Sequence, residues 1–427
     1  MEQRKRALEE LVDGGRGKTK SSCRQCGSAL DVSFCNLGTS PLANSLVEQK
    51  DRNAAEKHYP LELFVCSNCF LVQLDAFETP DAIFSNYSYF SSYSSTWLEH
   101  AKSYVDKVCS QFKFDKRSQV VEIASNDGYL LKEFIRRAIP AVGIEPAVNV
   151  AKAAQEAGVP TINEFFGTRL ASQLTQEGLS ADLIVANNVL AHVPDLRDFV
   201  GGLKILLAPT GIMTIEFPHL LRLIREVQFD TVYHEHFSYF SFFAAENLMA
   251  MHGLQVFDVD RLDTHGGSLR LYVAHESRSL CQTAAVEALR KDELDAGLLD
   301  IDAYQSFPAL VRGVRRSLLR FLLDAEEDGK IVVGYGAPAK AVTLLSYCGI
   351  GSDLIKFTVD RSPHKQGRLL PGSRLPIFET DRIALTKPDY ILIFPWNIKD
   401  EIIEQLSYAR SWGAKFVVPI PEVTIIP

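Results

Sequence analysis

The stretch VVEIASNDGYLLKEF, residues 120–134, decides the fold of this chain. Its β-branched beginning predicts a strand over 119–123, and after a tight turn the pattern predicts a helix over 129–137. A second strand over 142–145 and a second helix over 148–157 follow directly. Strands that alternate with helices at this spacing predict βαβ units and therefore a parallel sheet.

The alternation continues toward the carboxyl end of the chain. Apolar runs predict strands over 181–186 and 212–217, and the charged stretch 281–327 has a helical pattern. The segment KIVVGYG then opens a second α/β layer of about 100 residues, with strands predicted at 330–336, 357–360, 390–394 and 415–419. The predicted fold class is therefore α/β, with more than one sheet.

Two acidic residues end the first pair of predicted strands. Glu122 precedes the turn at 124–128, and Glu145 ends the next strand, where doubly wound folds place the carboxylate that binds a ribose diol. The turn and the helix N-terminus offer amides as a polar cradle. Gly128 is the only glycine in the turn, so the GxGxxG dinucleotide motif is absent. The pattern favours an adenosine ligand without pyrophosphate over NAD; the alternative is an ordinary βα turn with solvated carboxylates.

Four cysteines in two CxxC pairs indicate a metal site in a first unit, which has short strands predicted near 61–65 and 70–74. Two such pairs can surround one zinc ion tetrahedrally, and a site closed by four thiolates is structural. The predicted ligands are Cys23, Cys26, Cys66 and Cys69, with Cys35 as a spare candidate; the alternative is four unligated buried cysteines.

Composition excludes several classes of protein. A chain of 427 residues predicts two or three domains, and 45 basic against 53 acidic residues give a net charge of −8, which disfavours a nucleic-acid binder. No run approaches the roughly 18 apolar residues of a membrane span, and the first twenty residues lack the apolar core of a secretory signal. Eight cysteines are too few for a disulfide scaffold, so a cytoplasmic location is expected.

The motifs together resemble the S-adenosylmethionine-dependent sugar C-methyltransferases that act on nucleotide-linked 4-keto-deoxyhexoses. The resemblance covers about residues 22–425 and is carried by CRQCG, FVCSNC, NYSYFSSYS, VVEIASNDGYLL, GIEPA, NNVLAHVPD, YHEHFSYFS, DTHGGSLRLYV and GYGAPAKA. It implies a small zinc-binding N-terminal domain, a central Rossmann-like methyltransferase domain and a C-terminal Rossmann-like α/β domain that helps to hold the nucleotide-sugar. We place these at 21–85, 86–280 and 281–427, after a flexible tail at 1–20.

The resemblance also implies roles for individual residues. It gives the zinc ion to the four cysteines above. Residues implied to border S-adenosylmethionine are Glu122, Ser125, Asp127, Gly128, Glu145, Asn187 and Asn188. Residues implied to form the catalytic group are Tyr87, His192, Tyr233, Glu235 and His236.

The chemistry of carbon methylation fits this catalytic group. A C–H beside a ketone becomes a nucleophile when a base removes its proton and donors stabilise the enolate. His236 is the predicted base, Tyr hydroxyls can donate to the oxyanion, and Glu235 could fix the histidine tautomer. Adjacent side chains on a strand point apart, so Glu235 and His236 can share one site only in an irregular segment. The alternative is that His234 and His236 are structural histidines.

Substrate contacts are predicted in three further motifs. The tyrosines of NYSYFSSYS, Tyr87 before Tyr89 and Tyr93, could line a sugar pocket or merely pack between domains. Candidates in the later motifs are His265 and Arg270, then Gly336 and Lys340, the last two for the diphosphate, with Asp360 ending the next strand. Arg270 could instead lie on a solvated face, and GYGAPAK could be an ordinary βα turn.

The expected activity is transfer of the methyl group of S-adenosylmethionine to C3 of a dTDP-linked 4-keto-deoxyhexose, through an enolate formed by His236. The alternatives are methylation of another carbon or a hydroxyl of a natural-product intermediate, or a non-catalytic zinc-containing assembly protein. The expected partner is the nucleotide-linked keto-deoxysugar, without nucleic acid or membrane.

Overall fold

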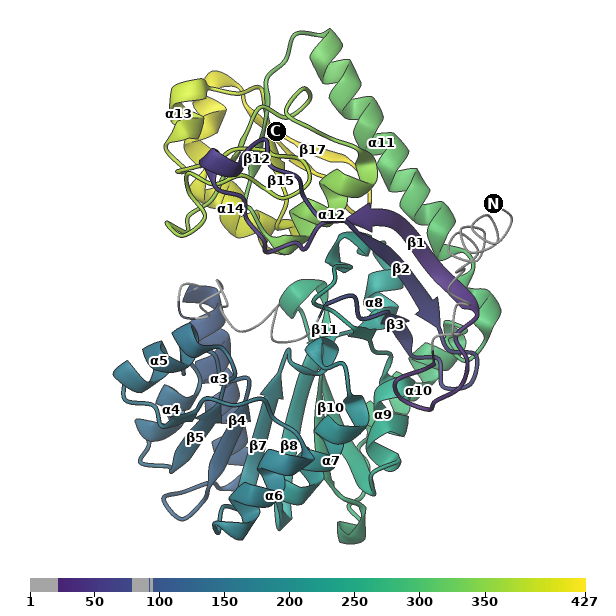
Figure 1. Cartoon of the computed structure of the whole chain (residues 1–427), viewed down its shortest axis with the longest axis vertical. Helices are drawn as coiled ribbons and strands as arrows, with labels where there is room; N and C mark the ends of the chain where they lie inside the picture. The colour runs from purple at the N-terminus through teal and green to yellow at the C-terminus, as the bar shows by residue number, and fades with distance from the viewer. Residues whose placement is uncertain (1–21, 79–91, 93–94) are drawn as a thin grey trace, which may run out of the picture.

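The computed structural model describes residues 22–78, 92 and 95–427. Within these ranges the chain forms sheets of four, seven and six strands, arranged as three units (Figure 1). None of the helices in the described ranges is both long enough and apolar enough to cross a membrane. The predicted α/β class is confirmed.

The first sheet is antiparallel and has the order β1-β2-β3-β9. Its first three strands are β1 (Val32–Ser40), β2 (Tyr59–Val65) and β3 (Val72–Leu74), with the short helix η1 (Gln49–Asp51) between β1 and β2. Every second residue of β2 is buried, as expected for a strand with one face on the core. The fourth strand, β9 (Ser238–Tyr239), comes from the middle of the chain, so the central unit completes this sheet.

The central sheet has the order β10-β11-β8-β7-β4-β5-β6. Its parallel strands are β4 (Val120–Ile123), β5 (Ala141–Ile144), β6 (Thr161–Ile162), β7 (Ala181–Asn187) and β8 (Leu207–Pro218). Strand β11 (Ser268–His275) is antiparallel to both β8 and β10 (Leu254–Leu262). This is the predicted Rossmann-like arrangement, and the strands predicted at 119–123, 142–145, 181–186 and 212–217 are confirmed.

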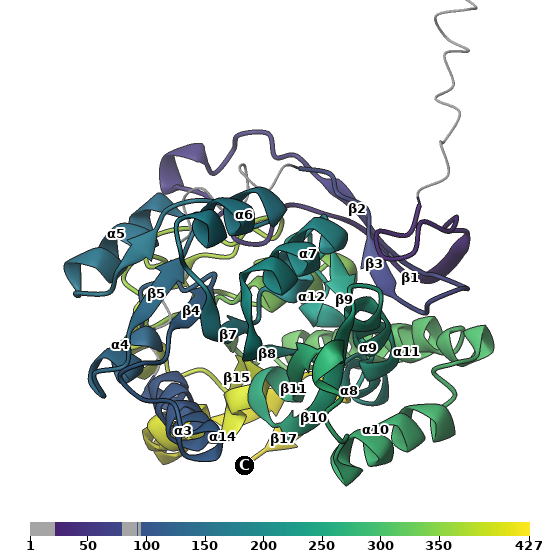
Figure 2. The ribbon, with the colours of Figure 1, turned by 90° about the horizontal axis from the view of Figure 1, so that it is seen from below.

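Helices cover both faces of the central sheet (Figure 2). One face packs on α3 (Ser95–Phe112) and α4 (Leu131–Ile135), and the other on α6 (Thr168–Gln176) and α7 (Leu196–Leu206). The remaining helices of this unit are α5 (Val148–Glu156), α8 (Leu220–Arg225) and α9 (Phe242–Ala250). Because helices cover both faces of the sheet, β7 has an apolar run at 183–186 and all four residues of β4 are buried.

Two helices, α10 (Ala284–Asp295) and α11 (Phe307–Glu327), lead to a mixed α/β sheet, as the helical pattern of 281–327 predicts. This sheet has the order β14-β13-β12-β15-β16-β17, and only β17 (Thr424–Ile426) runs antiparallel. Its parallel strands are β12 (Val332–Tyr335), β13 (Thr358–Val359), β14 (Ile377–Phe378), β15 (Tyr390–Ile393) and β16 (Lys415–Val418). The connecting helices are α12 (Ala339–Cys348), α13 (Arg382–Thr386) and α14 (Lys399–Gln405).

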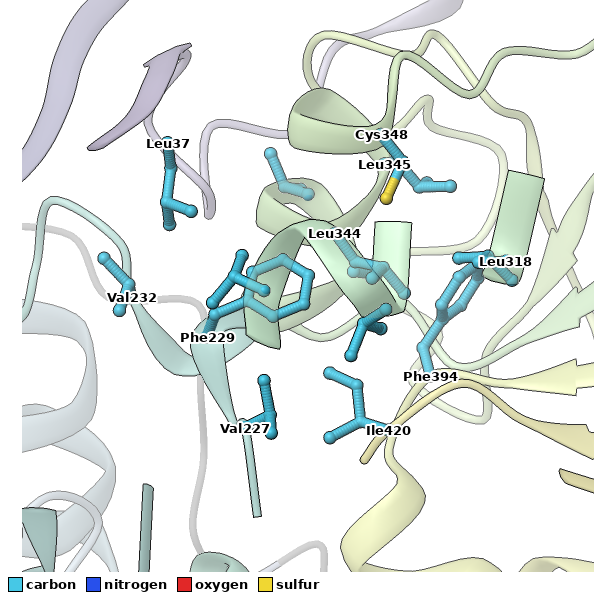
Figure 3. Close-up of a cluster of buried hydrophobic side chains, with 14 of the residues drawn as sticks. Leu37, Val227, Phe229, Val232, Leu318, Leu344, Leu345, Cys348, Phe394 and Ile420 are labelled. Atoms are coloured by element: carbon cyan, nitrogen blue, oxygen red, sulfur yellow. The ribbon is translucent and has the colours of Figure 1, made fainter. Parts of the chain in front are cut away.

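One apolar cluster joins the three units (Figure 3). Leu37 of β1, Phe229 of the central unit and Leu344 of α12 are all buried in it, with at most 3% of their surface exposed. Phe229 lies in η4 (Phe229–Thr231), which packs on α12. The segment that follows η4 is therefore fixed by both terminal units.

Candidate active site

The four predicted zinc ligands converge in the structure. Their Sγ atoms lie within 4.8 Å of one another, and the Cys23–Cys69 and Cys26–Cys66 pairs are each 3.5 Å apart. A tetrahedral zinc with Zn–S bonds of about 2.3 Å needs sulfurs about 3.8 Å apart, so the donor set fits the ion. Cys35 is not part of the cluster: it is buried in β1, where burial raises the pKa of its thiol to about 12.

The loop after β4 is tightly coiled at the carboxyl edge of the central sheet. Ala124, Asn126 and Gly128 all have positive φ, between 50° and 73°. A Cβ on Gly143 of β5 would lie 2.2 Å from Ser125 Oγ, so the glycine is needed for the loop to rest against β5. The predicted turn is thus confirmed, with its polar groups gathered at the edge where open α/β sheets bind ligands.

Acidic groups and unpaired oxygens fill this edge. Glu145 accepts hydrogen bonds from the amides of Asn126 at 2.9 Å and Ala147 at 2.8 Å. Burial raises the pKa of Glu122, and the nearby Asp127 and Glu145 raise it further. At this edge, the buried oxygens that have no hydrogen-bond partner among the described residues belong to Glu122, Ser125, Asp127, Asn187 and Asn188. A cationic ligand with amine and hydroxyl donors, such as S-adenosylmethionine, fits these acceptors.

A second polar group lies in residues 229–236, which we call the reaction loop. Tyr233 Oη lies 3.0 Å from His236 Nε2, and His236 Nδ1 lies 3.0 Å from the carbonyl of Thr231. Because a carbonyl only accepts, Nδ1 carries the proton, and Nε2 is left as the acceptor and basic nitrogen. Burial lowers the pKa of His236 well below its usual range, so the neutral form predominates near neutral pH.

Glu235 and His236 could share one site only if the backbone were irregular, and the reaction loop is irregular: the His236 amide donates to the Tyr233 carbonyl at 2.9 Å in a turn. Glu235 does not fix the tautomer of His236, which corrects our expectation. Its carboxylate instead accepts from Asn44 Nδ2, at 2.8 and 2.7 Å, in the N-terminal unit. The Thr231 carbonyl fixes the tautomer.

His192 joins the reaction loop to the edge of β7. It lies in η3 (Leu190–His192), just after Asn187 and Asn188, and its ring centroid is 4.7 Å from that of His236. His192 Nδ1 lies 2.8 Å from the carbonyl oxygen of Glu235, and burial lowers the pKa of its imidazole to about 4. The structure therefore brings the implied donor site and the reaction loop to one edge.

His234 faces away from this group. Its Nε2 lies 3.1 Å from the carbonyl of Pro60, and its ring packs against Tyr59 and Phe77. The spacing of the YHEH motif does not distinguish His234 from His236, but the structure does. Tyr87, Tyr89 and Tyr93 lie outside the described residues.

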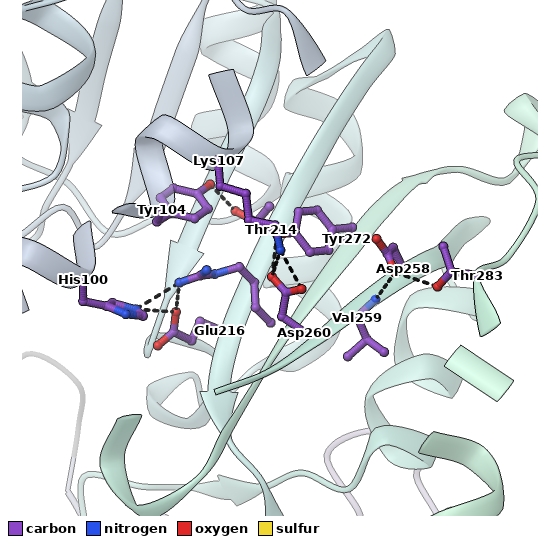
Figure 4. Close-up of polar contacts among 11 residues, drawn as sticks. His100, Tyr104, Lys107, Thr214, Glu216, Asp258, Val259, Asp260, Tyr272 and Thr283 are labelled. Carbon is purple, nitrogen blue, oxygen red and sulfur yellow. Dashed lines mark hydrogen bonds and ion pairs between the residues drawn. The ribbon is translucent and has the colours of Figure 1, made fainter. Parts of the chain in front are cut away.

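Arg270 is placed differently from our prediction of a substrate contact. Its Nη2 lies 2.5 Å from Glu216 Oε2, and its guanidinium covers the ring of Tyr104 at 4.4 Å. Figure 4 shows Glu216 hydrogen-bonded to His100, and Tyr104 hydrogen-bonded to Thr214. Only 3% of Arg270 is exposed, so it lies neither on a solvated face nor open to a phosphate. Burial opposes ionisation of Glu216, but His100 and Arg270 outweigh it and lower the pKa of that carboxyl to about 2.

His265 and Lys340 lie where the central and C-terminal units meet. His265 is exposed, with its ring 5.1 Å from that of Trp97. Lys340 Nζ donates to Asn397 Oδ1 at 2.8 Å and lies 4.2 Å from the ring centroid of Trp396. His265 and Lys340 therefore both place polar side-chain atoms where the central and C-terminal units meet.

Local structure accounts for the presence of Gly336 and Asp360. A Cβ on Gly336 would lie 2.7 Å from Pro395 Cδ, so packing requires the glycine. The carboxylate of Asp360 accepts from the amides of Ala337 and Ser362, each at 2.8 Å. The turn after β12 is therefore stabilised by contacts within the C-terminal unit.

The sequence did not single out Asn44, Asp230 or Trp396. Trp396 Nε1 donates to Asp230 Oδ2 at 2.8 Å, and burial raises the pKa of Asp230 to about 6. None of the three belongs to a recognisable motif; the signal in the sequence is that a tryptophan, which is rare here at three per chain, follows shortly after a predicted strand.

A hollow of about 550 Å³ lies elsewhere. It is lined by Gln119, Pro140 and Pro160, which precede β4, β5 and β6. It is therefore at the amino edge of the central sheet, opposite the polar groups described above.

Comparison with known proteins gives three matched regions, of which the third begins within the central unit, before β11. Residues 23–84 match a zinc binding domain model, residues 97–259 a methyltransferase domain model, and residues 263–421 the model described as C-methyltransferase C-terminal domain. The C-methyltransferase NovU of Streptomyces niveus is 36% identical over 405 residues, which cover 95% of this chain and 96% of that protein.

More distant similarities are confined to part of the chain. An ubiquinone biosynthesis O-methyltransferase of Bartonella tribocorum is 26% identical over 118 residues, 26% of this chain and 48% of that protein. A magnesium protoporphyrin IX methyltransferase structure from Synechocystis, 12% identical, covers 42% of this chain and 79% of its own, with a TM-score of 0.33. The near full-length similarity is decisive: the chain belongs to the S-adenosylmethionine-dependent C-methyltransferases that combine a zinc-binding N-terminal domain, a methyltransferase domain and a C-terminal domain.

Proposed function

We propose that this C-methyltransferase methylates C3 of a dTDP-linked 4-keto-deoxyhexose through an enolate. The observation that carries the proposal is the arrangement of Tyr233, His236 and the Thr231 carbonyl beside His192. It provides a neutral histidine with a fixed tautomer and a hydroxyl at its basic nitrogen. General-base removal of a proton beside a ketone needs this combination.

The proposed steps use these residues as follows. His236 Nε2 takes the proton from C3, and the Thr231 carbonyl holds the opposite nitrogen of the forming imidazolium. The C–H electron pair enters the enolate, whose C4 oxygen accepts a hydrogen bond from Tyr233. S-adenosylmethionine supplies the electrophilic methyl group, and S-adenosylhomocysteine leaves.

The donor is held at the carboxyl edge of β4, β5 and β7 in this proposal. Glu145 binds the ribose hydroxyls, while Glu122, Ser125, Asp127, Asn187 and Asn188 contribute their unpaired oxygens. The positive φ of Gly128 shapes the turn that carries Ser125 and Asp127. The four cysteines hold zinc as a structural ion, because a site closed by four thiolates has no open position.

The sugar nucleotide is proposed to lie between the reaction loop and the junction of the central and C-terminal units. Lys340 is the proposed contact to the diphosphate, because its ammonium has only Asn397 as a hydrogen-bond acceptor among the described residues. His265 is proposed to contact the sugar, and Tyr87 keeps the place in the catalytic group that the resemblance implies. Arg270 and Gly336 are left out, since the ion pair with Glu216 and the contact with Pro395 account for them.

The test is an incubation of the protein in D2O with methyl-labelled S-adenosylmethionine and a dTDP-4-keto-deoxysugar, followed by mass spectrometry. We expect label on a ring carbon and, without the donor, deuterium at C3. His236→Asn should lose at least about 100-fold in both reactions, the usual scale of general-base catalysis, with unchanged binding of S-adenosylhomocysteine.

The matched control is His252→Asn. His252 precedes β10 at the amino edge of the central sheet, so its replacement should leave both reactions unchanged. Label on an oxygen, or deuterium exchange that persists in His236→Asn, would contradict the proposal. Failure with several keto-sugars while S-adenosylhomocysteine still binds would leave the C-methyltransferase but remove this substrate class.

A further inference from the structure

The N-terminal unit contributes a side chain to the reaction loop. Asn44 and Glu235 are 191 positions apart, yet Asn44 Nδ2 lies 2.8 and 2.7 Å from the two carboxylate oxygens of Glu235. Asn44 is in the connection between β1 and η1, in the unit that also carries the cysteine cluster. One amide group thus spans the boundary between this unit and the site.

Glu235 depends on this contact. Only 4% of the Glu235 surface is exposed, and no lysine or arginine among the described residues forms an ion pair with its carboxylate. Burial raises the pKa of its carboxyl to about 7, and the hydrogen bonds of Asn44 oppose that rise. The Asn44 backbone also hydrogen-bonds this carboxylate, but without the two side-chain hydrogen bonds Glu235 would bear more of its desolvation cost, which favours movement or protonation of Glu235.

Movement of Glu235 would reach the histidines. The carbonyl oxygen of Glu235 is the partner of His192 Nδ1 at 2.8 Å, and Glu235 lies inside the turn closed by the bond from the His236 amide to Tyr233. The His192 and His236 rings are 4.7 Å apart. Fixing the Glu235 side chain therefore fixes the main chain that orients both imidazoles.

The connection that carries Asn44 is itself anchored. Leu46 bonds back to the Asn44 carbonyl at 2.9 Å, and Val47 exchanges two backbone hydrogen bonds with Leu369, at 3.0 and 2.8 Å. Leu369 belongs to the C-terminal unit, and the N-terminal segment runs along that unit in Figure 1. These hydrogen bonds fix the backbone around Asn44, so the Asn44 side chain can hold the reaction loop in one position.

We propose that Asn44 is a positioning residue for proton removal: its amide fixes the Glu235 carboxylate, and through the Glu235 main chain it sets His192 and His236. This inference rests on the proposed function, because it assigns the loop a role in abstracting the C3 proton. It gives the N-terminal unit a part in the reaction besides holding its metal ion.

The test compares Asn44→Ala and the isosteric Asn44→Asp with Asn53→Ala, which replaces an exposed asparagine between η1 and β2. A misplacement near 1 Å costs about 100-fold, so we expect kcat and the C3 exchange rate to fall about 10- to 100-fold in both Asn44 variants. The KM for the sugar and the affinity for S-adenosylhomocysteine should stay within about twofold, as for Asn53→Ala.

A second measurement needs no substrate. In protein with ¹⁵N-labelled histidine rings, the His192 Nδ1 signal, assigned with His192→Asn, should shift or broaden in both Asn44 variants but not in Asn53→Ala. An unchanged signal together with a kcat within twofold of wild type would overturn the inference. If wild type methylates no keto-sugar, the proposed function fails, while the histidine spectrum still decides whether Asn44 positions His192.

Discussion

Replacement of Arg270 should lower the stability of the folded protein and leave its affinity for the substrate unchanged. Arg270→Met removes the guanidinium 2.5 Å from Glu216, whose side chain is completely buried. Breaking a buried ion pair from one side costs about 3–5 kcal/mol when the other charge stays buried without compensation. Glu216 keeps His100 as a partner at 3.2 Å in the variant, so we expect a loss at the lower end of that range, about 3 kcal/mol.

The assay is thermal and urea unfolding, with the KM for the sugar measured in parallel. A loss of this size lowers the melting temperature of a unit of this length by about 10 °C. The double variant Glu216→Gln/Arg270→Met should recover most of the loss, since neither partner then leaves a charge behind. If Arg270→Met melted within 2 °C of wild type and only KM rose, our reading of Arg270 as a structural residue would be refuted.

The pH dependence of the same pair has a definite sign. The folded-state pKa of Glu216 is depressed, so its stabilisation is fully present above the unfolded value near 4.5 and is lost as the pH falls toward 2. In Arg270→Met the buried carboxyl protonates more readily, which relieves its desolvation cost. The difference in stability between wild type and variant should therefore narrow as the pH falls from 7 to 4.5.

Two further predictions concern the cofactor sites. Gly143→Ala would place a methyl group 2.2 Å from Ser125 Oγ and should weaken the binding of S-adenosylhomocysteine about tenfold, as measured by calorimetry. Gly313 has open space around it, so Gly313→Ala should bind S-adenosylhomocysteine as wild type does. Equal affinities in the two variants would contradict the loop geometry. Cys69→Ser should lose bound zinc in metal analysis and lower the melting temperature, while Cys35→Ser should keep its zinc; loss of zinc in both would restore Cys35 as a ligand.

The sequence predicts best where one local pattern determines one element. Strand β7 is covered on both faces and appears as an apolar run, and β4 is recognised by its β-branched beginning; both were located to within a residue. The CxxC pairs are equally local, which is why the metal cluster was found before the fold was known. Strand β1 was missed because two register shifts and a glycine break its alternation.

Predictions failed where the answer depends on which elements become neighbours. Arg270 lies on β11, and only the sheet order reveals that this strand runs between β10 and β8, under Tyr104 of α3. A residue on an interior strand with both faces covered has no solvated side. The partner of Glu235 could not be read from the motif either, because Asn44 is distant in the chain and lies in a segment without periodicity.

The short strand β9 also has consequences for the synthesis of the chain and for its truncation. The edge of β3 stays open until Ser238 has left the ribosome, on the order of ten seconds after Leu74 at ordinary rates of synthesis. During that interval the nascent N-terminal sheet presents an unpaired edge to other chains. A fragment that ends before β9 would keep that edge permanently, so the cysteine-rich unit cannot be expressed as an independent module or exchanged between relatives without the segment around residues 238–239.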